Sequence, residues 1–138
     1  MHHHTSALVL ALGLWAFLGG CGQKTRQEKT YPVAGTVRVD EEPLKDGEIY
    51  FRVIETGSLM IVPVKEGRFA GRAPGGRNRV EINAFREVIT PEGKAMYGEL
   101  ATPSRHNTIP AKYNLESNLH ADVQPDGGNK FAFEVSLQ

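Results

Sequence analysis

The chain has 138 residues, with 16 Lys and Arg against 16 Asp and Glu, one cysteine and a hydrophobic fraction of 40%. That length corresponds to about one domain. A formal net charge of zero argues against a nucleic-acid-binding surface, which needs an excess of basic residues. A single cysteine excludes an intrachain disulfide and a cysteine-rich zinc site. The composition is that of a globular protein without nucleic acid as a partner.

The start of the chain is apolar, and residues 2–20 contain no Asp, Glu, Lys or Arg. Residues 7–18 (ALVLALGLWAFL) form an apolar run of 12. Because a helix that spans a bilayer needs about 20 such residues, the run instead has the length of the hydrophobic region of a secretory signal peptide. It ends in the sequence LGGC, with small residues directly before Cys21. We predict a signal peptide over residues 1–20.

The sequence LGGC resembles the lipobox of bacterial lipoproteins, in which the cysteine is acylated and the signal is cut just before it. We therefore expect lipid on Cys21, and several acyl chains at about 0.8 kcal/mol per buried CH₂ would hold the protein on a membrane. In that class Asp after the cysteine is the usual signal for inner-membrane retention, whereas here Gly22 follows. The resemblance thus favours the outer membrane, with the domain facing the periplasm or the exterior. A plain secretory signal with a chance cysteine and a short uncleaved anchor are the alternatives.

Residues 23–30 (QKTRQEKT) contain no apolar side chain. We therefore interpret residues 21–30 as the lipidated cysteine and a flexible tether. The nine residues 22–30 reach about 30 Å when fully extended. The domain, residues 31–138, is expected to lie close to the lipid surface.

From residue 31 onward apolar and polar residues alternate, which indicates half-buried strands. The expected strands lie at residues 33–39, 49–53, 59–64, 68–70, 80–84, 119–123 and 131–137. About seven short strands and no long helix predict an all-β protein, specifically a β-sandwich. By their alternation, four phenylalanines belong to its core: Phe51, Phe69, Phe131 and Phe133.

Finer expectations follow from the same pattern. Pro63 makes its strand an edge or an irregular one. The alternation directs Arg79, Glu81 and Asn83 outward. The Gly-containing turns at residues 74–76 and 125–129 are expected to close hairpins.

Residues 87–112 break the pattern, since they contain three prolines and two glycines and little periodicity. A loop of this length in a small domain is usually functional or mobile, so we expect a binding surface there, with an insertion draped over the sandwich as the alternative. Tyrosines with amides and cations suit a sugar or a peptide. The candidate binding residues are Tyr97, Arg105, His106, Asn107, Lys112 and Tyr113. The alternative for Tyr113 is packing on the rim of the sandwich.

Five sequence motifs carry a resemblance to a known family. The first contains Val33, Gly35, Val37, Asp40, Pro43, Leu44, Gly47, Ile49 and Phe51. Two turns follow, one at Glu66-Gly67-Arg68-Phe69 and one at Pro74-Gly75 before Val80-Glu81-Ile82. The closing motifs contain Ile109, Pro110, Lys112, Tyr113, Asn114, Ser117 and Leu119, then Asn129, Phe131, Phe133 and Val135.

In these motifs the chain resembles short lipoproteins of planctomycete-type bacteria that carry a transthyretin-like, or carboxypeptidase-regulatory-like, β-sandwich. The resemblance covers most of residues 31–138 and implies a fold and an envelope location, but no known activity. Glu41 stands where the family has a turn glycine. Because a positive φ is more costly for Glu than for Gly, a two-residue type I′ turn is not expected there.

Candidate catalytic chemistry is sparse. His120 and Asp122 lie two residues apart on one face of a strand, so they and His106 are weak candidates for metal ligands, with a solvated strand face as the alternative. The chain contains no G-x-S-x-G elbow and no compact metal motif. We therefore expect no enzymatic activity and no cofactor.

These observations predict a membrane-anchored cell-envelope lipoprotein with a binding or structural role. Its partner would be another envelope protein, bound through residues 87–112 or by β-augmentation at a sheet edge. One alternative is a carbohydrate- or peptide-recognition module of a surface enzyme complex, which would bind a polysaccharide or a peptide. A remote alternative is a small metal-dependent hydrolase that uses His106, His120 and Asp122.

Overall fold

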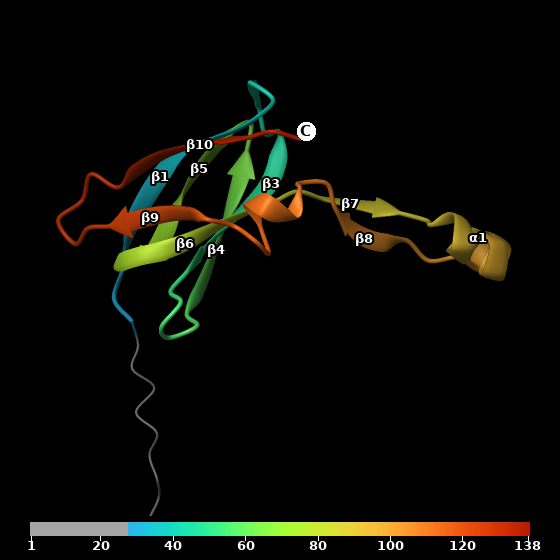
Figure 1. Cartoon of the computed structure of the whole chain (residues 1–138), viewed down its shortest axis with the longest axis horizontal. Helices are drawn as coiled ribbons and strands as arrows, with labels where there is room; N and C mark the ends of the chain where they lie inside the picture. The colour runs from blue at the N-terminus through green and yellow to red at the C-terminus, as the bar shows by residue number, and fades with distance from the viewer. Residues whose placement is uncertain (1–27) are drawn as a thin grey trace, which may run out of the picture.

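The computed structural model describes residues 28–138 (Figure 1). Its strands are β1 (Thr30–Val39), β2 (Glu42–Pro43), β3 (Asp46–Arg52), β4 (Leu59–Lys65), β5 (Arg68–Pro74), β6 (Gly76–Asn83), β7 (Phe85–Val88), β8 (Ser104–Asn107), β9 (Leu119–Val123) and β10 (Lys130–Val135). The helices are α1 (Pro91–Tyr97) and the 3₁₀ turns η1 (Gly98–Leu100) and η2 (Ala111–Tyr113). Strands make up 54% of the described residues and helices 12%, which confirms the predicted all-β class.

Seven strands form one curled sheet in the order β10-β1-β5-β4-β3-β6-β9, and β2 pairs with β1 beside it. Neighbouring strands are antiparallel except for β1 and β10, which run parallel. Between β4 and β5 only two residue pairs are in register, next to the Glu66-Gly67 turn. The sheet therefore bends at this hairpin into two halves, β10-β1-β5 and β4-β3-β6-β9.

Pro63 accounts for the place of the bend. In a hairpin with a two-residue turn, the pair Lys65–Arg68 exchanges hydrogen bonds, and residue 63 would be the next to donate to β5. Proline has no N–H to donate, so the ladder between β4 and β5 ends after Val64. The prediction that Pro63 makes this strand irregular is confirmed.

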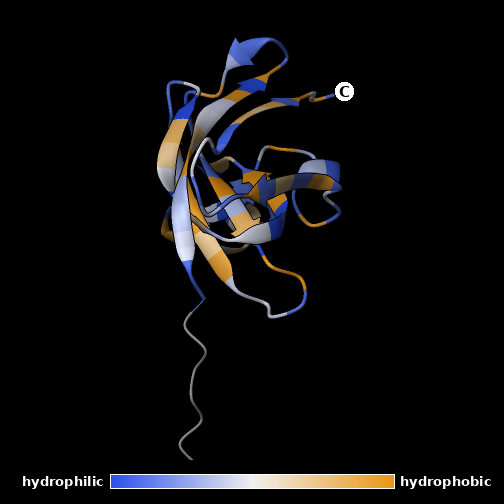
Figure 2. Cartoon of the chain, turned by 90° about the vertical axis from the view of Figure 1, so that its left-hand side faces the viewer, coloured by the Kyte–Doolittle hydropathy of each residue, from blue (hydrophilic) through white to orange (hydrophobic). Residues whose placement is uncertain are grey.

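The hydrophobic core lies between the two halves of the sheet. Along the strands buried apolar residues alternate with exposed ones, as the hydropathy colours show (Figure 2). A row of phenylalanines crosses the core, because Phe51 on β3 lies 6.1 Å from Phe69 on β5 and 6.4 Å from Phe131 on β10, measured between ring centroids. Phe133 continues the row at 6.2 Å from Phe131. All four phenylalanines predicted for the core contact it, with Phe131 only partly buried.

The first hairpin corrects an expectation about Glu41. Asp40 and Glu41 have φ values of 47° and 69°, and they join β1 to β2 as a two-residue turn despite the cost for a non-glycine residue. Two hydrogen bonds stabilise the turn. Arg38 donates to the Glu41 carbonyl, and the amide of Leu137, near the C-terminus, donates to Asp40 Oδ1 at 3.1 Å.

Two expected hairpins are instead crossovers between the halves of the sheet. The turn at residues 74–76 joins β5 to β6, which do not pair with each other. The loop at residues 125–129 joins β9 to β10, which are the two opposite ends of the strand order. Gly-rich sequence favours a reversal of the chain but carries no information on whether the flanking strands then pair.

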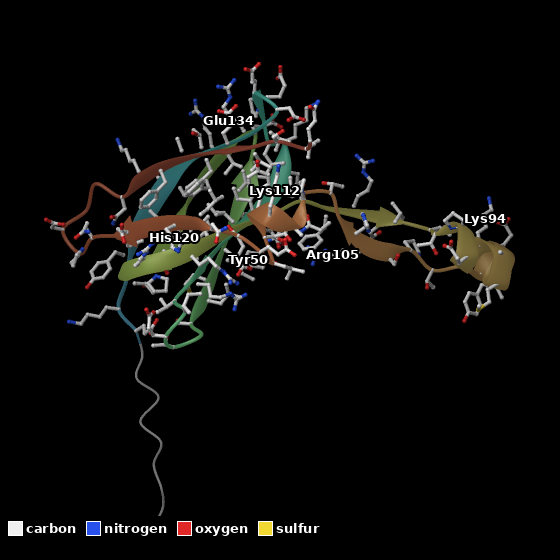
Figure 3. The ribbon with its side chains drawn as sticks, viewed as in Figure 1. Tyr50, Lys94, Arg105, Lys112, His120 and Glu134 are labelled. Atoms are coloured by element: carbon white, nitrogen blue, oxygen red, sulfur yellow. The ribbon has the colours of Figure 1, made fainter. Side chains whose placement is uncertain are left out.

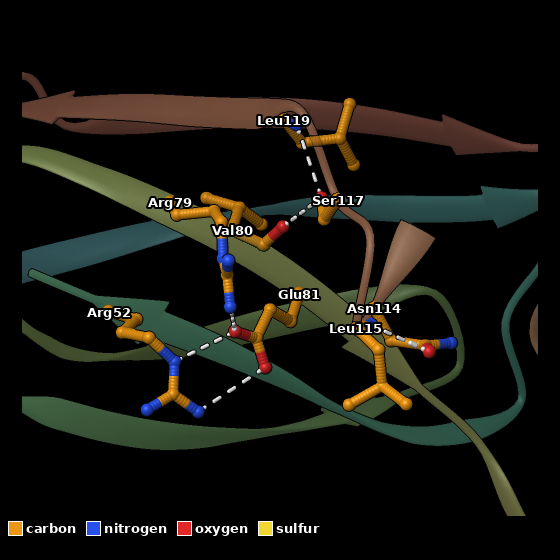
Figure 4. A network of polar contacts seen from close by, with 8 residues as sticks. All are labelled: Arg52, Arg79, Val80, Glu81, Asn114, Leu115, Ser117 and Leu119. Atoms are coloured by element: carbon orange, nitrogen blue, oxygen red, sulfur yellow. Dashed lines mark hydrogen bonds and ion pairs between the residues drawn. The ribbon is translucent and has the colours of Figure 1, made fainter. Parts of the chain in front are cut away.

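Glu81 and Asn83 lie on the outer face of β6, as predicted, but this face is covered and not open to solvent. Both lie on the face of β6 opposite its core residues, but only 4% of Glu81 and 5% of Asn83 is exposed. Arg52 and Arg79 cover Glu81 with hydrogen bonds (Figure 4), and Asn107 bonds to Asn83 from β8. A period-two pattern identifies a face of the strand, but it does not show what packs on that face.

Three buried polar residues of the closing motifs have structural roles. Asn114 Nδ2 donates to the carbonyls of Ile109 and Pro110 at 2.9 and 3.0 Å. The Ser117 hydroxyl donates to the Val80 carbonyl and accepts from the Leu119 amide (Figure 4). Asn129 ties the crossover loop to β1, since its Nδ2 donates to the Pro32 carbonyl at 3.0 Å.

Candidate functional site

Residues 85–107 form an arm that projects from the sheet (Figure 1). Strands β7 and β8 pair antiparallel from Phe85–Asn107 to Val88–Ser104, in a two-stranded sheet separate from the main one. Helix α1 lies at the far end, and Thr90 caps it by accepting a hydrogen bond from the Gly93 amide at 3.1 Å. The segment that lacked periodicity in the sequence is therefore an ordered extension rather than a loop.

The tip of the arm exposes apolar side chains. Neither α1 nor η1 contains a buried residue. The exposed fractions are 49% for Ile89, 72% for Met96, 61% for Tyr97 and 86% for Leu100. A seven-residue helix has little stability of its own in water, and several large apolar side chains exposed in one short segment make that segment a candidate interaction site. We call these four residues the arm tip.

The base of the arm is fixed to the sheet by polar contacts. Asn107 Oδ1 accepts from the amides of Ala84 and Ile109, both at 3.1 Å. Arg105 donates to Glu48 Oε1 at 3.3 Å, and its guanidinium lies 3.8 Å from the centre of the Phe85 ring. These contacts give Asn107 and Arg105 structural roles that their sequence context did not reveal.

Tyr50 and Glu48 on β3 complete the base of the arm. The Tyr50 hydroxyl donates to Glu48 Oε2 at 2.8 Å. The pKa of Tyr50 lies above its usual value. Burial is the largest cause, and the hydrogen bond to Glu48 and the negative charge of Glu48 act in the same direction. The phenol therefore keeps its proton, and donates this hydrogen bond, to a higher pH than an ordinary tyrosine would.

Lys112 and Tyr113 lie on η2, against the body and not in the arm. The Tyr113 hydroxyl accepts from the Ser136 amide at 3.1 Å, and the ring packs against the core. Lys112 Nζ donates to the carbonyl of Gln138 at 2.8 Å and lies 5.1 Å from the centre of the Tyr113 ring. These contacts place Tyr113 on the rim of the sheet, which was the alternative interpretation.

The six predicted binding residues thus do not form one surface. Tyr97 lies at the arm tip, Arg105, His106 and Asn107 lie on β8, and Lys112 and Tyr113 lie on η2. Figure 3 labels two of them, Arg105 and Lys112. Sequence reasoning missed Ile89, Met96 and Leu100. The sequence carries only a weak signal for these three residues. They are large apolar side chains in a segment with Pro and Gly, and they follow neither the spacing of a strand nor that of a helix.

The three weak metal candidates come from different parts of the fold. His106 lies on β8 in the arm, whereas His120 and Asp122 lie on β9 opposite Arg79 and Arg77 of β6. Among residues 28–138, no group of three His, Cys, Asp or Glu side chains is placed to hold a metal ion. The structure does not bring together the ligand set of the metal-dependent hydrolase.

Glu81 forms the most buried ion-pair cluster on the outer surface of the second half (Figure 4). Arg52 Nε donates to Glu81 Oε1 at 2.8 Å, and Arg79 Nε donates to the same oxygen at 3.2 Å. Burial raises the pKa of Glu81, but the hydrogen bonds from Arg52 and Arg79 outweigh it, so the pKa lies below the usual value. One carboxylate binds both guanidiniums, so the cluster holds β3 and β6 together and keeps one net positive charge.

The predicted signal peptide (residues 1–20) and the predicted lipidation site Cys21 lie outside the described residues, as does most of the tether. Strand β1 begins at Thr30. No helix within residues 28–138 is long and apolar enough to cross a membrane.

Comparisons with protein-family models, with curated protein sequences and with solved structures gave no significant match.

Proposed function

We propose that this protein is a lipid-anchored lipoprotein of the bacterial cell envelope, that its domain is a transthyretin-like β-sandwich, and that it binds a partner protein through the arm tip. The anchor is Cys21, and the membrane is the outer one. The role is binding and not catalysis. The partner is a second protein of the envelope with an apolar recess that receives the arm.

The observation that supports this proposal is the exposure of the arm tip. Met96 and Leu100 are 72% and 86% exposed at the end of an arm whose base is hydrogen-bonded to the sheet. A rigid base with an apolar tip presents its side chains at low entropic cost to a partner. Burying large apolar side chains in a pocket is the usual source of affinity in such contacts.

The buried polar residues support the transthyretin-like interpretation. Asn114, Ser117 and Asn129 are motif positions of the resemblance, and each one bonds backbone groups inside the described fold. The bend at the β4–β5 hairpin also creates two facing halves, as a sandwich requires.

Photo-crosslinking in cells tests the docking role. A photoreactive amino acid at Leu100 is expected to form an adduct with one protein of the membrane fraction. The matched control is Ile54, which is 57% exposed in the β3–β4 connection. Met96→Asp should abolish the adduct at Leu100. Absence of an adduct at Leu100, or equal adducts at Leu100 and Ile54, would contradict the proposal.

A further inference from the structure

The outer face of the β10-β1-β5 half carries a shallow groove that the proposed partner contact does not use. Its volume is about 830 Å³, and a neighbouring hollow of 340 Å³ shares Ala34, Ala70 and Lys130 with it. Small side chains form its floor, since Ala34 lies opposite Ala70 of β5 and Thr36 lies opposite Ala132 of β10. Longer side chains, Arg68 and Lys130, stand at its margins.

On the outer face of these three strands the charged side chains have one dominant sign. Four exposed cations point from this half of the sheet to the outside: Arg38, Arg68, Arg72 and Lys130. Glu134, in register with Arg38, is the carboxylate on the same face. Lys65 lies at the margin, but Asp46 neutralises it at 2.7 Å. Within residues 28–138, none of the four exposed cations forms an ion pair.

The other half of the sheet provides an internal comparison. On its outer face Glu48, Glu81 and Asp122 balance Arg52, Arg79 and Arg77. There Glu81 binds two of the three arginines. Of the two outer faces, only the β10-β1-β5 face therefore has a net positive charge on its strands, and this charge favours an anionic partner.

The groove also lies next to the point where the tether enters the domain. Its floor strand, β1, begins at Thr30, and Arg72 donates a hydrogen bond to Thr30 Oγ1 at 3.0 Å. The tether itself carries Lys24, Arg26 and Lys29 against Glu28. The eight residues between Cys21 and β1 allow at most about 30 Å of separation from the lipid.

We infer that the β10-β1-β5 face rests on the anionic lipid headgroups of the membrane that holds the anchor. This inference depends on the proposed function, because it assumes acylated Cys21. A flat floor of small side chains with cations at its margins fits a bilayer surface, to which each basic side chain adds about fivefold in association. The arm leaves the sheet after β6, in the other half, so the two contacts use different parts of the molecule.

Fluorescence quenching on the acylated full chain tests this inference. Because Cys21 is the only cysteine, Thr36→Cys introduces one free thiol in the groove for a fluorophore. The protein is placed in phosphatidylcholine vesicles with or without phosphatidylglycerol, and a spin-labelled headgroup lipid serves as the quencher. We expect quenching at residue 36 in the anionic vesicles, weak quenching in the neutral ones, and loss of the difference at high salt.

Two matched variants assign the effect to the groove. Arg68→Gln with Lys130→Gln should reduce the ratio of quenched to unquenched protein about 25-fold, as the product of two fivefold effects. Arg86→Gln with Lys94→Gln, which removes the same charge from the arm, should leave it unchanged. A fluorophore at His120→Cys on the other half should stay unquenched.

The outcomes separate the inference from the proposed function. Mass spectrometry of the same sample reports acylation, so an unmodified Cys21 counts against the anchor. An unquenched label at residue 36 on acylated protein overturns the groove inference, and so does equal quenching in neutral and anionic vesicles. A further outcome is that headgroups do not quench the label but added polyglutamate changes its fluorescence. In that case the groove binds an acidic polymer, and the membrane assignment is wrong.

Discussion

At Glu81, burial and hydrogen bonding act on the same carboxylate in opposite directions. The hydrogen bonds from Arg52 and Arg79 outweigh burial and lower the pKa of Glu81. The folded protein therefore binds a proton at Glu81 less readily than the unfolded chain does. The stabilisation is therefore fully present above the ordinary pKa of 4.5 and is lost as the pH falls through the lower folded value. Acid should release the clamp between β3 and β6.

Glu81→Gln is expected to lower the free energy of unfolding by about 2 kcal/mol at neutral pH, because charge-assisted hydrogen bonds to two arginines are lost. The gap between the variant and the natural protein should narrow below the pKa of 4.5. Urea unfolding across this pH range measures both effects. Asp46→Asn is the control, since its pair with Lys65 is 74% and 68% exposed and should matter little. A gap that stays constant with pH would contradict this account.

Gly35 allows β1 to pass close to the phenylalanine row. A Cβ there would lie 1.9 Å from the Phe131 carbonyl oxygen and 2.8 Å from Phe69 Cζ. Gly35→Ala should therefore destabilise the protein by about 1–3 kcal/mol through overpacking. Thermal unfolding measures the change, and Gly93→Ala, in helix α1, should have a smaller effect, because its Cβ would meet only Thr90 Oγ1, at 3.2 Å. Similar effects for the two variants would show that the packing around Gly35 is looser than described.

Among the elements, the strands of the body were predictable and their pairing was not. Alternation identified the core positions of β3, β9 and β10, and Pro63 indicated an irregular strand. Nothing in the local sequence distinguishes a hairpin from a crossover at residues 74–76 or 125–129, because turn residues reverse the chain in both cases. The I′ turn at Asp40-Glu41 was missed because its cost is offset by distant groups near the C-terminus.

The arm was missed for a related reason. Its helix and strands bury little, so residues 85–107 lack the periodicity that burial produces. The predicted binding residues therefore share a segment with the proposed arm tip, but only Tyr97 belongs to it. Exposed apolar residues outside any pattern were the signal to follow.

The arm and the core should respond differently to substitution. Leu100→Asp at the arm tip should change the free energy of unfolding by less than about 0.5 kcal/mol, since Leu100 is 86% exposed. Phe51→Ala in the phenylalanine row, where Phe51 is fully buried, should cost about 3–5 kcal/mol. Urea unfolding compares the two variants. A large loss of stability in Leu100→Asp would show that the tip packs on its own domain, and it would contradict a docking role.

For the whole molecule, the proposed arrangement assigns one contact to each part of the chain. In this proposal Cys21 holds the protein on the membrane, the β10-β1-β5 face rests on headgroups, and the arm tip binds a partner. The sequence predicts the first of these contacts through the sequence LGGC. The other two depend on which strands lie side by side and on what is left uncovered, which no single segment of sequence specifies.

The membrane anchor is the claim on which this arrangement depends, and one measurement tests it directly. The protein is extracted from membranes, its intact mass is determined and its N-terminal peptide is sequenced. We predict a mature chain that begins at Cys21 with a diacylglyceryl group on the thiol and an acylated amino group. An unmodified Cys21, in a chain that is full-length or cut elsewhere, would contradict the account.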